Sequence, residues 1–104
     1  MAGVVGRKLW ELSRDHQVLC VTHLPQVAAF ADLHLLVSKQ LVDGRSRTRI
    51  AKLDGSERIE ELAAMLAGPR PSVSARRSAQ ELIEMAQSAK ESESRGPRRE
   101  ARPA

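Results

Sequence analysis

The chain has 104 residues and a formal net charge of +4, which allows one small domain. A single cysteine excludes an internal disulfide. No apolar run approaches the roughly 18 residues that span a bilayer, and no signal-peptide core opens the sequence. We therefore expect a cytoplasmic protein without a membrane partner.

The first predicted element is a helix over residues 3–13. Val5, Leu9 and Leu12 recur at helical spacing and would share one face. No capping residue precedes this helix, so its start is abrupt.

Residues 17–21 predict a buried strand, because their apolar residues form a continuous run and do not alternate with polar ones. Pro25 then suits the first turn of a short helix over residues 26–31. Thr22 or His23 stands where that helix would be capped.

A β-hairpin is expected next, with strands over residues 33–41 and 45–53. Asp43 and Gly44, between the two strands, are a typical two-residue turn. In the second strand, arginines alternate with uncharged residues, so one face is wet and basic. This pattern is typical of an antiparallel hairpin at the edge of a sheet.

Two amphipathic helices follow, separated by a stop signal at Gly68 and Pro69. Ser72 or Ser74 would cap the second helix. The apolar positions that would pack are Ile59, Leu62, Ala63 and Leu66 in the first helix and Ala75, Ala79, Leu82, Ile83 and Ala86 in the second. Residues 90–104 lack periodicity and predict a disordered basic tail.

The predicted order of elements is α-β-α-β-β-α-α, in the α/β class. A strand that is apolar on both faces needs neighbouring strands and two covering layers, and this sequence offers only one further hairpin. We therefore expect residues 1–89 to be the end of a larger domain, with an incomplete sheet.

Thr22 and His23 are the best candidates for a site, since ligands gather beyond the carboxyl ends of strands in open α/β sheets. A histidine there can hydrogen-bond a phosphate oxygen or position a water molecule. The alternative is that both side chains only cap the short helix. Their spacing alone does not choose between the two.

A zinc site would have to draw on His16, Cys20, His23 and His34. Strand geometry sends His16 and Cys20 to one face of the sheet, which keeps the four side chains from converging. We expect no metal, and interpret Cys20 as a buried thiol that acts as a small hydrophobe.

The hairpin region is rich in positive charge. Residues 39–58 hold six basic and three acidic side chains, namely Lys39, Arg45, Arg47, Arg49, Lys52 and Arg58 against Asp43, Asp54 and Glu57. Such an edge can contact a nucleic acid backbone by charge, or it can be a solvated edge whose charges prevent aggregation. No aromatic residue is interleaved to stack on bases, which favours the solvated edge.

Several stretches of the sequence resemble the end of the ATPase head of the RecN family, SMC-like DNA repair proteins within the wider group of ABC-type ATPases. They are HQVLCVTHLPQVAAFADLHLLVSK at residues 16–39, TRIAKL in the hairpin, RIEELAAMLAG at residues 58–68 and the helix around residues 79–83. The string VTHLPQVA is the most specific part of this resemblance.

The resemblance implies that His23 is a switch-loop histidine, which approaches the γ-phosphate of ATP held between two heads. Thr22 and Gln26 would flank this histidine and shape its loop. The resemblance further implies a P-loop ATPase fold, with ATP and Mg²⁺ as cofactors of the complete protein and a homodimer of heads. It also implies action on DNA in double-strand break repair and recombination, with a nucleoid-associated location.

The sequence departs from the family in what it lacks. It has no G-x-x-x-x-G-K-[ST] loop and no apolar strand ending in Asp-Glu, and the signature motif is also absent. We therefore expect the chain to need the N-terminal part of the head as its partner, and to hold no cofactor and have no activity alone. The alternatives are a small basic nucleic-acid-binding module and a non-functional truncated remnant.

Overall fold

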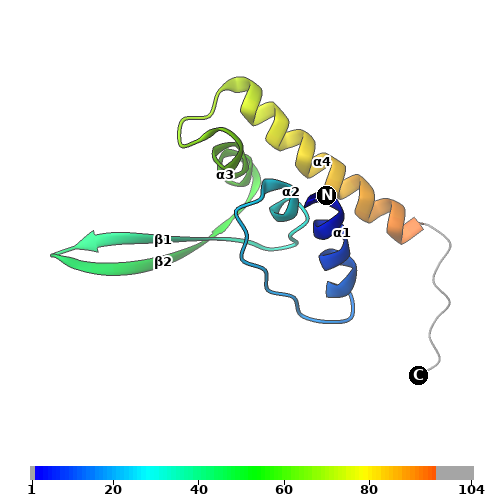
Figure 1. The fold of residues 1–104 in the computed structure, drawn as a ribbon, viewed down its shortest axis with the longest axis horizontal. Coiled ribbons are helices and arrows are strands. Elements are labelled where there is room, and N and C mark those ends of the chain that lie inside the picture. The colour runs from blue at the N-terminus through cyan, green and yellow to red at the C-terminus, as the bar shows by residue number, and fades with distance from the viewer. Residues whose placement is uncertain (1, 96–104) are drawn as a thin grey trace.

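The computed structural model describes residues 2–95. The chain forms α1 (Ala2–Ser13), α2 (Pro25–Ala28), β1 (His34–Val42), β2 (Arg45–Leu53), α3 (Gly55–Ala67) and α4 (Val73–Arg95). The four helices gather into one body, and the two strands project from it as an arm (Figure 1). This arrangement confirms the α/β class, but the predicted order is wrong at one element.

The strand predicted over residues 17–21 does not form; these residues carry no regular secondary structure. The side chains of Leu19 and Val21 are 86% and 96% exposed. A strand is stabilised only by hydrogen bonds to a neighbour, and the one sheet within residues 2–95 contains β1 and β2 alone. The apolar pattern of this segment therefore has no partner within the described chain.

The hairpin forms as predicted. β1 and β2 pair antiparallel, in a register that runs from His34 opposite Leu53 to Val42 opposite Arg45. Asp43 and Gly44 take φ values of 52° and 73°. Two consecutive residues with positive φ make the tight turn that matches the twist of a hairpin, and Asp-Gly is suited to it.

The core of the helical body is built mainly from alanine. Leu62 of α3 is the one large side chain with no exposed surface among residues 2–95. The buried cluster consists of Ala28, Ala29, Leu62, Ala63, Ala75, Ala79 and Ala86. These residues come from α2 and its C-cap Ala29, from α3 and from α4, and the predicted apolar stripes of the last two helices supply most of them. Small side chains allow the helices to approach closely, but they bury little apolar surface each.

Helix α4 is capped as predicted, because Ser72 Oγ accepts a hydrogen bond of 3.1 Å from the backbone N–H of Ala75. The helix continues to Arg95, past the boundary at residue 90 where a tail was expected. Lys90 has a side chain only 13% exposed and is part of the packed body. Residues 96–104, the remainder of the predicted tail, lie outside the described residues. Within residues 2–95 no helix combines the length and apolarity needed to cross a membrane.

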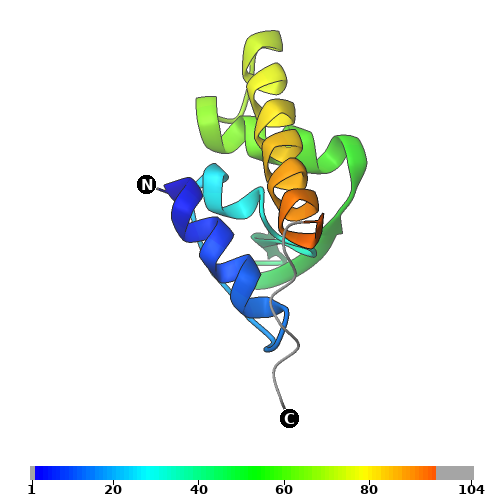
Figure 2. The same ribbon diagram turned by 90° about the vertical axis from the view of Figure 1, so that its right-hand side faces the viewer.

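Helix α2 lies between α1 and α4 (Figure 2). The contact between α1 and α2 depends on Gly6, the buried residue of α1. A Cβ atom built on Gly6 would lie 2.8 Å from Phe30 Cδ2 and 3.1 Å from the carbonyl oxygen of Gln26. Glycine is thus needed here for close approach of the two helices.

We expect Gly6→Ala to lower the free energy of unfolding by about 1–3 kcal/mol, because the added methyl group forces α1 away from α2. Gly3→Ala is the matched control on the same helix, since a Cβ there meets nothing within 4 Å. The control should be neutral or gain up to about 1 kcal/mol through helix propensity. Urea denaturation measures both, and equal effects at the two positions would contradict the steric account.

Candidate functional site

The loop that carries Thr22 and His23 is held by a local hydrogen bond. The backbone N–H of Leu24 donates to Thr22 Oγ1 at 3.0 Å. Leu24 itself occupies the N-cap position of α2, with no side-chain cap, and Pro25 follows at the first helical position. The prediction that Thr22 or His23 caps this helix is therefore wrong. Thr22 shapes the turn one step earlier and leaves His23 at its apex.

His23 is exposed and Gln26 is half-buried at the start of α2. Pro25 and Val27 beside them are buried. The buried apolar residues thus hold the loop against the helical body, while the imidazole of His23 is exposed to solvent. Such an imidazole can donate a hydrogen bond to an oxyanion that approaches from outside the body.

The histidines and the cysteine do not assemble into a metal centre. His16, Cys20 and His23 are all exposed, and among residues 2–95 no group of three or more potential ligands lies close enough to hold an ion. The interpretation of Cys20 as a buried thiol is wrong, because it depended on the strand that this chain does not form.

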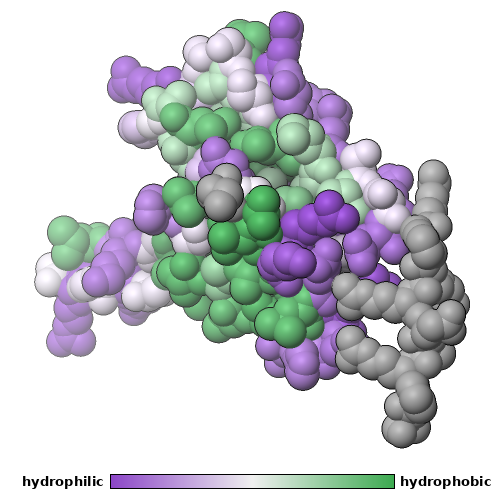
Figure 3. Space-filling view, turned by 45° about the vertical axis from the view of Figure 1, so that its right-hand side comes forward, coloured by the Kyte–Doolittle hydropathy of each residue, from purple (hydrophilic) through white to green (hydrophobic). Residues whose placement is uncertain are grey.

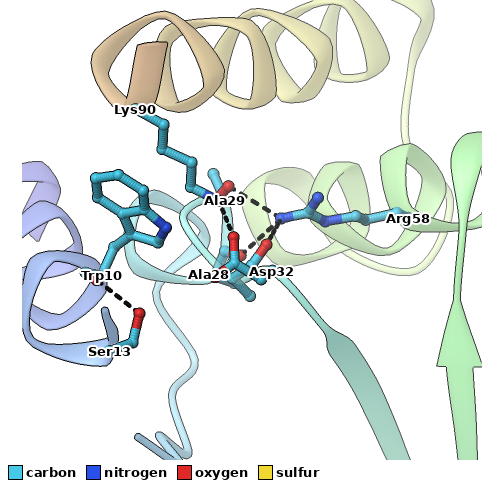
Figure 4. A network of polar contacts seen from close by, with 8 residues as sticks. Trp10, Ser13, Ala28, Ala29, Asp32, Arg58 and Lys90 are labelled. Carbon is cyan, nitrogen blue, oxygen red and sulfur yellow. Dashed lines mark hydrogen bonds and ion pairs between the residues drawn. The ribbon is translucent and has the colours of Figure 1, made fainter. Parts of the chain in front are cut away.

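Arg58, on the first turn of α3, binds the carboxyl end of α2. Its Nη2 donates to the carbonyl oxygens of Ala28 at 3.1 Å, Ala29 at 2.9 Å and Ala31 at 3.0 Å. Figure 4 shows the guanidinium group directed at this helix end. Carbonyl groups at the end of a helix lack intrahelical partners and carry partial negative charge, so a cation there is stabilising.

Burial lowers the pKa of Arg58, and the charge of Asp32 opposes that effect. His34, the first residue of β1, is partly buried near this arginine. Its pKa is lowered first by burial and then by the positive charge of Arg58. Both effects favour the neutral form of His34, whereas Arg58 keeps its charge despite its burial because a guanidinium group is not deprotonated in proteins.

A second polar contact joins α4 to the same region. Lys90 Nζ lies 2.7 Å from Asp32 Oδ1 and 5.6 Å from the centre of the Trp10 ring. The lysine thus spans from α4 to α1 and to the segment after α2, as Figure 4 shows. A buried stem with a cation over an aromatic ring contributes packing as well as charge.

Neither Arg58 nor Lys90 was predicted from the sequence as an anchor of the loop. A signal was present for Arg58, which precedes the buried Leu62 by four residues and so lies on the apolar stripe of its helix. An arginine on such a stripe needs a buried acceptor. No comparable signal marks Lys90, because its partners come from two distant elements.

We expect Arg58→Ala to lower the free energy of unfolding by about 2–3 kcal/mol, because three carbonyl oxygens lose a charged donor. Arg77→Ala is the control, since Arg77 is exposed on α4 and surface substitutions usually change stability by less than about 0.5 kcal/mol. Thermal and urea unfolding would measure both. A loss at Arg58 no larger than that at Arg77 would contradict the anchoring role.

Comparison with known proteins gives a consistent result. The chain is 53% identical over 83 residues to the DNA repair protein RecN of Mycobacterium tuberculosis. It is 49% identical over 84 residues to RecN of Xylella fastidiosa and 42% identical over 90 residues to RecN of Bacillus subtilis. The matches cover 80–86% of this chain. No model of a protein family matches it.

The matched residues are therefore similar to the C-terminal portion of RecN DNA repair proteins. The chain spans only 14–16% of the length of these relatives. The resemblance seen in the sequence is thus confirmed for this portion.

Proposed function

We propose that this chain forms the C-terminal part of a RecN-type ATPase head, acting in DNA double-strand break repair and recombination at the nucleoid. His23 is its switch-loop histidine in this proposal. The observation that carries it is the placement of His23, exposed at the apex of a fastened turn within a RecN-homologous segment. The remainder of the head, its ATP and its Mg²⁺ belong to the preceding portion of the protein.

His23 would act by donating a hydrogen bond from its imidazole to an oxygen of the γ-phosphate. Phosphoryl transfer is accelerated mainly by positioned donors and charge around the transferred group, with little covalent chemistry for the protein to do. Thr22 Oγ1 accepts from Leu24 N and retains its own proton to donate. Gln26 at the start of α2 would help to shape the loop.

The donors of this loop fit a contact to one phosphate group but not a complete nucleotide site. The sequence has no glycine-rich loop with a lysine to cradle phosphates, and no acidic pair after an apolar strand. When bound, ATP supplies the phosphoryl group that is transferred to water. We propose that a dimer of heads brings this nucleotide to His23.

The unpaired residues 17–21 support a sheet shared with the preceding portion. Leu19 and Val21 are almost fully exposed here, although a continuous apolar run is typical of a strand covered on both faces. Val4, Val5 and Leu12 of α1 are also more than half exposed, and Figure 3 shows a broad apolar area on this side of the helical body. We infer that strands and helices of the head cover these residues and place His23 at the end of the completed strand.

In a complete RecN-type head that contains this segment, we expect His23→Ala to lower kcat for ATP hydrolysis by about 10²–10³-fold, the usual effect of removing one transition-state donor. Nucleotide affinity should stay unchanged, because the phosphate-binding loop lies elsewhere. His16→Ala is the control, as an exposed histidine outside the turn. Unchanged turnover in His23→Ala, or equal losses in both variants, would remove His23 from the mechanism.

The shared sheet can be tested with Val21→Asp. This change should leave the melting temperature of the isolated chain unchanged, because Val21 is 96% exposed. It should abolish co-purification with the co-expressed N-terminal part of the head, since a buried unpaired carboxylate is costly.

Gln17→Asp is the matched control, placing the same charge at the polar end of the same segment, and should still assemble. Normal assembly of Val21→Asp, measured by size-exclusion chromatography, would contradict burial of this segment.

A further inference from the structure

The positive charge of the chain is concentrated on the projecting arm. Residues 34–53 contain five basic side chains and one acidic one, a net of +4. The other residues contain 12 basic and 12 acidic side chains, so they are neutral in sum. The formal net charge of +4 is thus the charge of the hairpin.

The hairpin has two different faces. Arg45, Arg47 and Arg49 lie at alternate positions of β2 and therefore share a face. Their partners on β1 are Val42, Gln40 and Ser38, so no carboxylate lies among them. The other face carries Leu35, Val37, Leu41 and Ile50, with Lys39 and Lys52 beside them.

The three arginines are exposed and available. All have the burial of surface residues, and among residues 2–95 no salt bridge or side-chain hydrogen bond is recorded for them. Alternate residues of a strand are about 6.8 Å apart. Phosphates on one strand of DNA rise about 3.4 Å per nucleotide along the axis and are also displaced around it, so the spacing between neighbouring phosphates is similar to that of the arginine row.

We infer that this arginine face binds the phosphate backbone of duplex DNA. The inference deepens the proposed function and rests on it. A two-stranded ribbon is narrow enough to enter a DNA groove, and the arm extends away from the helices, so the body does not obstruct its approach (Figure 1). The aromatic residues are Trp10 and Phe30, both outside the arm, so the contact uses charge and not base stacking.

The competing explanation is that the charges only keep an exposed strand edge from aggregating. Two double variants of the full chain separate these explanations, because each removes two positive charges from the same hairpin. Arg47→Gln with Arg49→Gln changes the arginine face, and Lys39→Gln with Lys52→Gln changes the opposite face. All four side chains are exposed, so melting temperatures should stay close to that of the wild type.

The probe is a fluorescent duplex of mixed sequence, with anisotropy measured between 50 and 200 mM salt. In the variant with Arg47→Gln and Arg49→Gln, the slope of log K for DNA binding against log salt should be less steep by about 1.8. Its loss of affinity between 50 and 200 mM salt should then be about twelvefold smaller than that of the wild type. The lysine pair should keep the wild-type slope. Arg47→Lys with Arg49→Lys should also keep it, because the charge remains.

Equal slope changes in the two glutamine variants would show that only the net charge of the hairpin matters, and this would overturn the inference. An unchanged slope in the variant with Arg47→Gln and Arg49→Gln would also overturn it. Neither result bears on His23, whose test is the turnover of ATP at unchanged nucleotide affinity. Failure of the arm and failure of the proposed function are therefore distinguishable.

Discussion

The hydrogen bonds from Arg58 to the carboxyl end of α2 are the interaction on which the rest of the helical body depends. Helix α2 has four residues, too few to be stable by itself, and the core around it consists largely of alanine. Such a core offers limited hydrophobic stabilisation. The guanidinium group compensates by joining α3 to three carbonyl oxygens at and just after the helix end, and Lys90 adds α4 and α1 to the same corner.

This anchor also determines where the candidate site lies. The turn with His23 leads directly into α2, whose first residues are buried and whose approach to α1 requires Gly6. The imidazole of His23 is therefore exposed to solvent, while the backbone that carries it is held in place by the packing of α2. A donor that must meet a phosphate in one geometry benefits from such a rigid support, because positioning carries most of the catalytic effect in phosphoryl transfer.

The two exposed parts of the molecule differ in kind. Residues 17–21 expose apolar side chains that a covering layer would bury, so they indicate a protein surface. The arginine face of the hairpin exposes charge without a carboxylate beside it, so it indicates a polyanion. His23 follows the first region directly in the chain, and the proposed DNA contact lies on the second.

The sequence by itself determined the elements whose stabilisation is local. Asp43 and Gly44 specify the hairpin turn, a serine at position 72 or 74 marks the start of α4, where the structure shows Ser72 as the cap, and the spacing of Ala75, Ala79 and Ala86 defines the buried stripe of that helix. It also placed His23 in a turn before a proline, and the structure shows His23 exposed in a bend there. Its role at a phosphate stays a prediction.

Only the tertiary structure decided what depends on distant partners. Residues 17–21 have a strand pattern but no neighbouring strand to supply hydrogen bonds, so the segment stays irregular and Cys20 stays exposed. Lys90 belongs to the body and not to a tail, because Trp10 and Asp32 meet it there. Local patterns fix turns and caps through adjacent atoms, whereas pairing and burial require elements that the sequence does not place side by side.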